Sequence, residues 1–254
     1  MIAKVNDLSG KVILVAGAGG GLGRHIVEEL TSRGGYVYAT SRSPQQLPCD
    51  CTESLMWLVG NSTNAKELRR MRDVIKRRHS QLDGLVYNIG SGKNQAGDGE
   101  TDEGWLQSFD INFFGLVRFI NVMESMLRDD GSSITCIGSI CGHEVIEGAP
   151  TEYNCAKAAL SMYVKTESFR FGPRGIRINE VAPGNILHDT SVWAKKMEKN
   201  PAIVQEMLEK TVPCKRLASA SEISSVVGFL MSDESRFING SSIRVDGGQT
   251  RGLS

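Results

Sequence analysis

The chain has 254 residues, and its 29 lysine and arginine residues balance 29 aspartate and glutamate residues, so the formal net charge is zero. A nucleic-acid-binding surface would need a basic excess, which this composition lacks. No apolar run approaches the ~18 residues of a membrane-spanning helix, and the first residues lead straight into a strand pattern. We therefore expect no nucleic-acid partner, no membrane span and no signal peptide.

The first elements of the chain follow the order strand, glycine-rich turn, helix, strand. The apolar run at residues 11–16 is typical of a buried parallel strand. A helix is predicted over residues 22–33, because apolar side chains recur there at helical spacing, and a second strand follows at 36–40. This succession predicts a mononucleotide-binding unit.

The turn between the first strand and helix has the spacing G-x-x-x-G-x-G. Gly17 allows the turn to form, Gly21 lets the backbone approach a pyrophosphate, and Gly23 allows close packing of the helix on the strand. The N-terminus of the following helix attracts phosphates. The position of the turn between a strand and a helix strengthens what the glycines alone would indicate.

Strands and helices alternate through the rest of the chain. Strands are predicted at residues 55–59, 82–88, 134–137, 176–181 and 241–245, and helices at 66–78, 105–127, 151–171 and 221–231. Residues 91–99 are expected to form a loop, and 187–211 a polar, partly helical insertion. We expect one α/β domain over residues 1–254, a doubly wound (Rossmann) seven-stranded parallel sheet flanked by helices, with a substrate lid at about 186–213.

The cysteine residues indicate a reducing environment. None of the six forms a C-x-x-C pair: Cys49, Cys51, Cys136, Cys141, Cys155 and Cys214. We expect reduced thiols in a cytoplasmic protein and no metal site.

Three residues around the fifth strand carry the chemistry. Tyr153 and Lys157 are four residues apart and share one face of the predicted helix. A free tyrosine has a pKa near ~10, and a nearby ammonium lowers it, so the phenol could exchange a proton with an oxygen near neutral pH. The hydroxyl of Ser139, at the strand end, could hold the same oxygen. This set suits interconversion of a carbonyl and an alcohol.

Together with the glycine turn, several short motifs resemble those of the short-chain dehydrogenase/reductase family over essentially the whole chain. They occur in the family's order and spacing. They are Asn88-Ile89-Gly90, Asn112, Ser139, Tyr153-Asn154-Cys155-Ala156-Lys157, Pro183-Gly184 and Val245-Asp246-Gly247-Gly248.

The resemblance implies a role for each matching position. Tyr153 would be the general acid/base, and Ser139 would orient the substrate oxygen. Lys157 would bind the nicotinamide ribose and lower the tyrosine pKa, and Asn112 would hold a water in a proton relay through Lys157. The cofactor-binding residues would be Gly17, Gly20, Gly21, Leu22, Gly23, Ser41, Arg42, Asn61, Ser62, Asn88, Ile89, Gly90, Tyr153, Lys157, Pro183, Gly184 and Ile186. The substrate-binding residues would be Ser139, Cys141, Tyr153 and Asn185.

The chain departs from the family pattern at three points. Ala16 precedes Gly17 where the family commonly has threonine, so a local turn hydrogen bond should be missing. Asn61 stands where an aspartate often contacts adenine. The threonine that usually follows Pro183-Gly184 is displaced, with Thr190 as the candidate replacement.

The end of the second strand predicts the cofactor. NAD-preferring folds place an acid there for the ribose 2′-hydroxyl, whereas this chain has Ser41 followed by Arg42. A guanidinium can bind a phosphate through two hydrogen bonds. We therefore expect a preference for NADP(H), with NAD(H) as the alternative if Arg42 only caps a surface turn.

The function expected from these features is oxidoreduction of a ketone and a secondary alcohol. The alternative is a non-catalytic dinucleotide-binding sensor or scaffold of the same fold. Cys141, His143 and Glu144 make the loop after Ser139 polar, which favours a sugar or another polar carbonyl compound over an acyl chain. His143 itself is expected to be a surface loop residue rather than a catalyst.

Apolar side chains on two predicted helices suggest self-association. Family members usually pair through the helices that carry Asn112 and Tyr153. The apolar residues on these helices are Phe113, Phe114, Phe119, Met162 and Phe169. We expect a homotetramer, with a homodimer as the alternative.

Overall fold

The computed structural model describes residues 7–43, 53–92 and 101–252. Cys49, Cys51 and most of the predicted loop at 91–99 lie outside these residues. The cysteines inside them are free thiols, in agreement with the prediction: Cys136, Cys141, Cys155 and Cys214.

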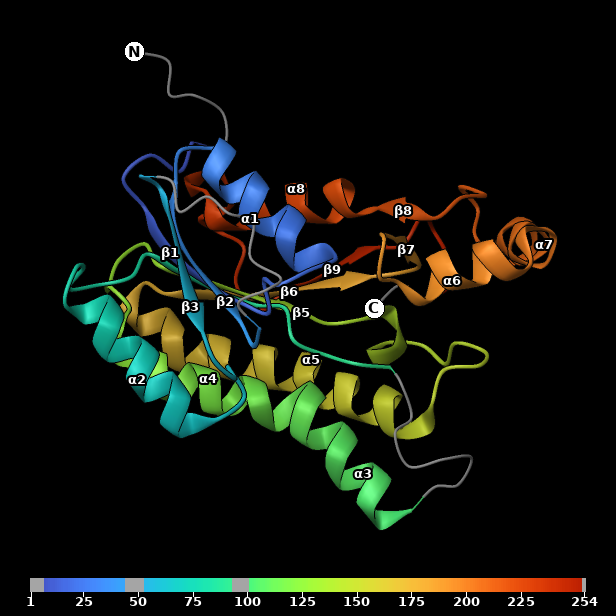
Figure 1. The fold of residues 1–254 in the computed structure, drawn as a ribbon, viewed down its shortest axis with the longest axis horizontal. Helices are drawn as coiled ribbons and strands as arrows, with labels where there is room; N and C mark the ends of the chain where they lie inside the picture. Colours follow the sequence, from blue (N-terminus) through green and yellow to red (C-terminus); the bar gives the residue numbers. More distant parts are fainter. Residues whose placement is uncertain (1–6, 44–52, 93–100, 253–254) are drawn as a thin grey trace.

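Seven parallel strands form one sheet in the order β3-β2-β1-β4-β5-β6-β9, which confirms the predicted doubly wound sheet (Figure 1). They are β1 (Val12–Ala16), β2 (Tyr36–Ser41), β3 (Leu55–Val59), β4 (Gly84–Tyr87), β5 (Ser133–Ile137), β6 (Arg177–Pro183) and β9 (Ser242–Val245). The chain runs outward from β1 to β3 and then returns to β4 on the other side of β1, so the order reverses there. In such sheets ligands bind outside the carboxyl ends of the strands at this reversal.

Helices cover both faces of the sheet. They include α1 (Leu22–Ser32), α2 (Ala65–Lys76), α4 (Gly115–Met123), α5 (Thr151–Phe171) and α8 (Ala220–Met231). Figure 1 shows α1 and α8 on one face and α2, α4 and α5 on the other. Alternate residues of β1 enter the two cores, Leu14 on one side and Ile13 on the other. Burial of both faces explains why the strands are continuous apolar runs.

The helix predicted over residues 105–127 is interrupted. It begins earlier, as α3 (Asp102–Phe109), passes through a π-helical turn (Asp110–Phe114) into α4, and ends in a 3₁₀ turn (Glu124–Met126). The Tyr87 hydroxyl donates to the Ile111 carbonyl across 3.3 Å. A Cβ at Gly115 would lie 2.4 Å from the Tyr87 hydroxyl oxygen, so this helix passes close to β4 only because residue 115 is glycine. π-Helical turns are frequent at functional sites, and this one carries Asn112.

The predicted lid region contains two short helices, α6 (Val192–Lys199) and α7 (Pro201–Thr211), at the right-hand end of Figure 1. Asn200 ends α6, and its side-chain oxygen accepts a hydrogen bond from the Ile203 amide to begin α7. A second, two-stranded sheet, absent from the sequence prediction, joins β7 (Ile186–Leu187) to β8 (Ala218–Ser219). It ties the start of this region to the N-terminus of α8. Whether the region acts as a lid stays a prediction.

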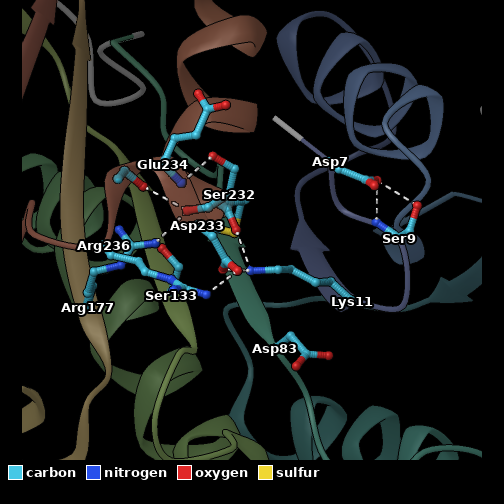
Figure 2. A network of polar contacts seen from close by, with 12 residues as sticks. Asp7, Ser9, Lys11, Asp83, Ser133, Arg177, Ser232, Asp233, Glu234 and Arg236 are labelled. Carbon is cyan, nitrogen blue, oxygen red and sulfur yellow. Dashed lines mark hydrogen bonds and ion pairs between the residues drawn. The ribbon is translucent and has the colours of Figure 1, made fainter. Parts of the chain in front are cut away.

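The amino ends of the strands are occupied by structural polar contacts (Figure 2). Arg177 Nη2 and Ser133 Oγ both donate to the Leu230 carbonyl at 2.8 Å, which satisfies the C-terminal end of α8. Lys11 Nζ pairs with Asp233 Oδ1 at 2.7 Å just beyond that helix. The contacts at the amino ends of the strands stabilise the fold. The predicted site residues lie at the carboxyl ends.

Candidate active site

The glycine turn after β1 requires glycine for steric reasons. Gly17 has φ of 79°, and a Cβ there would lie 2.8 Å from the Asn88 carbonyl oxygen. A Cβ at Gly23 would lie 2.0 Å from the Gly17 carbonyl oxygen. The Asn88 side-chain amide donates to that carbonyl at 3.0 Å, so the ends of β1 and β4 are joined.

The N-terminus of α1 can hold an anion. Its N-cap is Gly21, and within the described residues it has neither a side-chain cap nor an acidic residue in its first turn. The first amide groups of a helix have no partner within the helix and attract phosphates. The turn and the helix end have a geometry that could hold the pyrophosphate of a dinucleotide, and the assignment of Gly20, Gly21 and Leu22 to it stays a prediction.

The turn hydrogen bond expected to be missing at Ala16 is replaced from β2. The Gly17 amide donates to Thr40 Oγ1 at 3.2 Å, and the buried Ser62 hydroxyl donates to the same oxygen at 2.7 Å. Thr40 therefore takes over the structural role from a neighbouring strand. The Ser62 hydroxyl, predicted to bind the cofactor, donates its hydrogen bond to Thr40 instead.

Ser139, Tyr153 and Lys157 are brought together as predicted. Ser139 follows β5 and begins a 3₁₀ turn (Ile140–Gly142), where its hydroxyl accepts a hydrogen bond from the Cys141 amide at 3.2 Å. The Tyr153 phenol on α5 lies close enough to this hydroxyl for Ser139 to lower its pKa. One turn further along α5, Lys157 is 2% exposed, and its Nζ donates to the Ile137 carbonyl at 3.0 Å.

The pKa of the phenol contradicts the predicted direction. Burial raises the pKa of Tyr153 to about 12, and the hydrogen bond to Ser139 lowers it only in part. Lys157 Nζ lies 5.8 Å from the centre of the Tyr153 ring and donates to a backbone carbonyl, so burial outweighs the ammonium. Tyr153 is therefore protonated at neutral pH. Burial also lowers the pKa of Lys157, to about 8, although the Glu180 carboxylate opposes this shift.

Asn112 lies beside Lys157 and organises the segment after β4. Its Oδ1 accepts from the Ser91 amide at 2.9 Å, and its Nδ2 donates to the Ser91 carbonyl at 3.0 Å. A Cβ at Gly90 would lie 2.9 Å from Asn112 Oδ1 and 3.0 Å from Lys157 Nζ, so both groups face Gly90. The water relay proposed for Asn112 is not tested by these contacts.

Other predicted residues make local contacts. The Ser41 hydroxyl is bound to the backbone of Ser43, and Arg42 next to it is exposed. Asn61 Oδ1 accepts from the Thr63 amide and so forms a turn before α2. Ile89 lies against Gly17. Pro183 ends β6, Gly184 packs on Asp246, and Ile186 begins β7. Asn185 Nδ2 is buried and has no partner in the described part of the protein.

Sequence reasoning missed two features of the site. His188 lies against Gly21, where a Cβ would be 2.6 Å from the imidazole, beside Thr190, which the sequence had indicated. The prediction that His143 is a surface residue is wrong, because its Nε2 lies 3.2 Å from the fully buried Glu180 carboxylate. A glutamate inside an apolar strand was the signal that could have indicated this pair.

The described residues contain no group of three or more His, Cys, Asp or Glu side chains that could hold a metal ion. They also contain no helix with the length and hydropathy needed to cross a membrane.

Comparisons with known proteins identify the family. Residues 17–250 match a family model described as enoyl-(acyl carrier protein) reductase. The chain is 31% identical over 246 residues to the 3-oxoacyl-[acyl-carrier-protein] reductase FabG of Escherichia coli, covering 95% of this chain and 98% of the relative.

Solved structures of similar fold include an NADPH-bound short-chain oxidoreductase of Pseudomonas aeruginosa, described as containing an atypical catalytic center. The TM-score is 0.88 with 26% identity, covering 97% of this chain and 99% of the other. The aldohexose dehydrogenase of Thermoplasma acidophilum has a TM-score of 0.86 with 25% identity and covers 98% of each chain. The protein belongs to the short-chain dehydrogenase/reductase family, and it is an oxidoreductase of that family.

Proposed function

We propose that the protein interconverts a ketone and a secondary alcohol with NADP(H), using Tyr153 as the proton donor and acceptor. The observation that carries this proposal is the meeting of Ser139, Tyr153 and Lys157 outside the carboxyl ends of the strands, beside the glycine turn. A bound nicotinamide would supply or accept the hydride. A non-catalytic sensor would not need this set of groups.

Three residues would bind the substrate oxygen, donate the proton and bind the cofactor ribose. The protonated Tyr153 phenol donates its proton to a carbonyl oxygen, which suits the reductive direction at neutral pH. The Ser139 hydroxyl, which lies next to the phenol, would hold the same oxygen. The Lys157 ammonium lies 5.8 Å from the centre of the Tyr153 ring, where it would bind ribose hydroxyls.

The preference for NADP(H) rests on the end of β2. Ser41 is small and Arg42 is exposed at the strand end, where a guanidinium could pair with a 2′-phosphate. The NADPH-bound relative supports the same cofactor.

The substrate is proposed as a small carbonyl compound. Two residues that suggested a polar pocket have structural roles: His143 pairs with Glu180, and the Glu144 carboxylate accepts from the Arg251 amide at 2.6 Å. A polar substrate such as a sugar is therefore supported by Cys141, Asn185 and the aldohexose-dehydrogenase relative alone.

The test is NADPH oxidation with a panel of 3-oxoacyl thioesters, simple ketones and keto-sugars. Turnover on one of these classes, absent in Tyr153→Phe, supports the proposal. Tight NADPH binding without turnover on the whole panel would favour the sensor instead.

A further inference from the structure

A carboxylate lies buried behind the active site. Glu180 is on β6 and is 0% exposed, between Asn179 and Val181, which are equally buried. Its Oε1 accepts from Ser161 Oγ at 3.0 Å, and its Oε2 lies 3.2 Å from His143 Nε2. A buried carboxylate is costly unless it is paired and hydrogen-bonded, and both of its oxygens have partners here.

The neighbouring strand leaves space for this side chain. A Cβ at Gly138 would lie 1.7 Å from Glu180 Oε1, 2.5 Å from its carboxyl carbon and 2.8 Å from its Cγ. A residue with a Cβ at position 138 would therefore force the Glu180 carboxylate out of this position. Gly138 directly precedes Ser139. The residue that leaves space for the Glu180 carboxylate is therefore also the one before the turn that carries the serine.

His143 joins this carboxylate to α5 and β9. Its Nε2 also lies 2.9 Å from Ser242 Oγ on β9 and 3.3 Å from Ser161 Oγ on α5. A carboxylate only accepts hydrogen bonds, so Nε2 carries the proton toward Glu180. The serine hydroxyls complete the shell. The end of the Ser139 turn is thereby tied to α5, β6 and β9 through one imidazole.

The cluster lies against the helical turn of α5 that presents Lys157. Ser161 Oγ is 3.0 Å from the Lys157 carbonyl oxygen, and a Cβ at Gly142 would lie 2.7 Å from the Lys157 carbonyl carbon. The Ser139 turn and the Lys157 turn are thus packed together, and Ser161 links the Lys157 turn to the Glu180 carboxylate.

The titratable groups around Lys157 come from several elements. They are Tyr153 on α5, Cys136 on β5, Cys141 in the 3₁₀ turn, and Glu180 on β6 with its partner His143. Burial raises the pKa of both thiols and of the phenol, so these are neutral near pH 7. Among these groups, the Glu180 carboxylate opposes the effect of burial on the pKa of Lys157 most strongly.

We propose that Glu180, held by His143 in the space left by Gly138, is a positioning residue that keeps the buried Lys157 ammonium charged and fixes the Ser139 turn against α5. This inference rests on the proposed function, in which charged Lys157 binds the cofactor ribose. Glu180 touches neither substrate nor cofactor and acts through Lys157.

The test is the pH dependence of NADPH affinity, measured by nucleotide fluorescence between pH 6 and 10. Burial leaves the pKa of Lys157 near about 8 in the parent, so NADPH affinity should weaken as the pH rises through this value. Glu180→Gln keeps the shape and removes the charge, which should move this midpoint down by about one pH unit or more. Glu147→Gln removes a charge from an exposed position of the following loop and should leave the midpoint unchanged.

The outcomes separate the inference from the function. An unchanged midpoint in Glu180→Gln, with parent-like affinity at pH 6, would overturn the role of Glu180 while leaving the cofactor assignment intact. A parent that does not bind NADPH at any pH would instead overturn the proposed function.

A second measurement covers the case in which Glu180→Gln does not fold. Gly138→Ala in the parent must displace the carboxylate, so it should lower the melting temperature and shift the same midpoint. In a Glu180→Ala background the added methyl group meets neither the carboxylate nor Cγ of residue 180 and should cost little stability. An equal loss of melting temperature in both backgrounds would contradict the proposed pairing of Gly138 with Glu180.

Discussion

Asn112→Asp tests the role of Asn112 most sharply, because it changes one atom type in a closed hydrogen-bonded site. The side chain is 0% exposed, and its Nδ2 donates to the carbonyls of Ser91 and Ser108, both at 3.0 Å. Aspartate keeps the oxygen that accepts from the Ser91 amide. It replaces the donor with a second oxygen that faces two carbonyl oxygens.

The expected cost follows from these contacts. Two lost hydrogen bonds are worth about 1 kcal/mol each, and a buried charge without a partner costs about 3–5 kcal/mol. The Lys157 ammonium faces the same side of Gly90 and offsets most of the cost of this charge. We therefore expect a net loss of about 2–4 kcal/mol in the free energy of unfolding, together with lower turnover.

Urea unfolding at pH 7 and pH 5 measures this loss. The aspartate has a higher pKa in the folded than in the unfolded protein, so the deficit should be largest above the folded pKa and shrink as the pH falls. Asn121→Asp, on an exposed position of α4, is the matched control and should stay within about 0.5 kcal/mol of the parent. Parent-like stability of Asn112→Asp, or a deficit that grows at pH 5, would refute the reasoning.

Two further predictions follow from exposed residues. Arg42→Ala should lower the ratio of kcat/KM with NADPH to that with NADH, and a parent that prefers NADH, or an unchanged ratio, would contradict the reading of β2. On α5, Met162 is 66% exposed and Phe169 is 76% exposed, and Phe114 in the π-helical turn is 43% exposed. We expect a second copy of the chain to cover these apolar side chains. Light scattering should give a homotetramer or homodimer, which Phe169→Glu should weaken, whereas a monomeric parent at micromolar concentration would count against it.

The sheet and the glycine turn could be predicted because local sequence determines them. β1 and β2 are apolar runs that end next to the turn, and the glycines have no sterically acceptable replacement at Gly17 and Gly23. The Tyr153–Lys157 spacing places both side chains on one face of α5 whatever the remainder of the chain does.

The missed features depend on contacts between distant segments. The π-helical turn at Asn112 forms where Gly115 passes Tyr87 of β4, which helical periodicity cannot indicate. The raised pKa of Tyr153 follows from how closely the surrounding elements bury the phenol, and the ammonium alone suggested the opposite direction. Glu180 and His143 are 37 residues apart, and only the folded sheet shows that they form a pair.

The measurement that tests the central claim most directly is turnover by Tyr153→Phe, with the parent and the best carbonyl substrate of the panel under saturating NADPH. The variant keeps the ring and loses the proton donor, so kcat should fall by about 10²–10⁴-fold, while the dissociation constant of NADPH changes little. Turnover near the parent value would contradict the assignment of Tyr153 as the residue that gives its proton to the substrate oxygen.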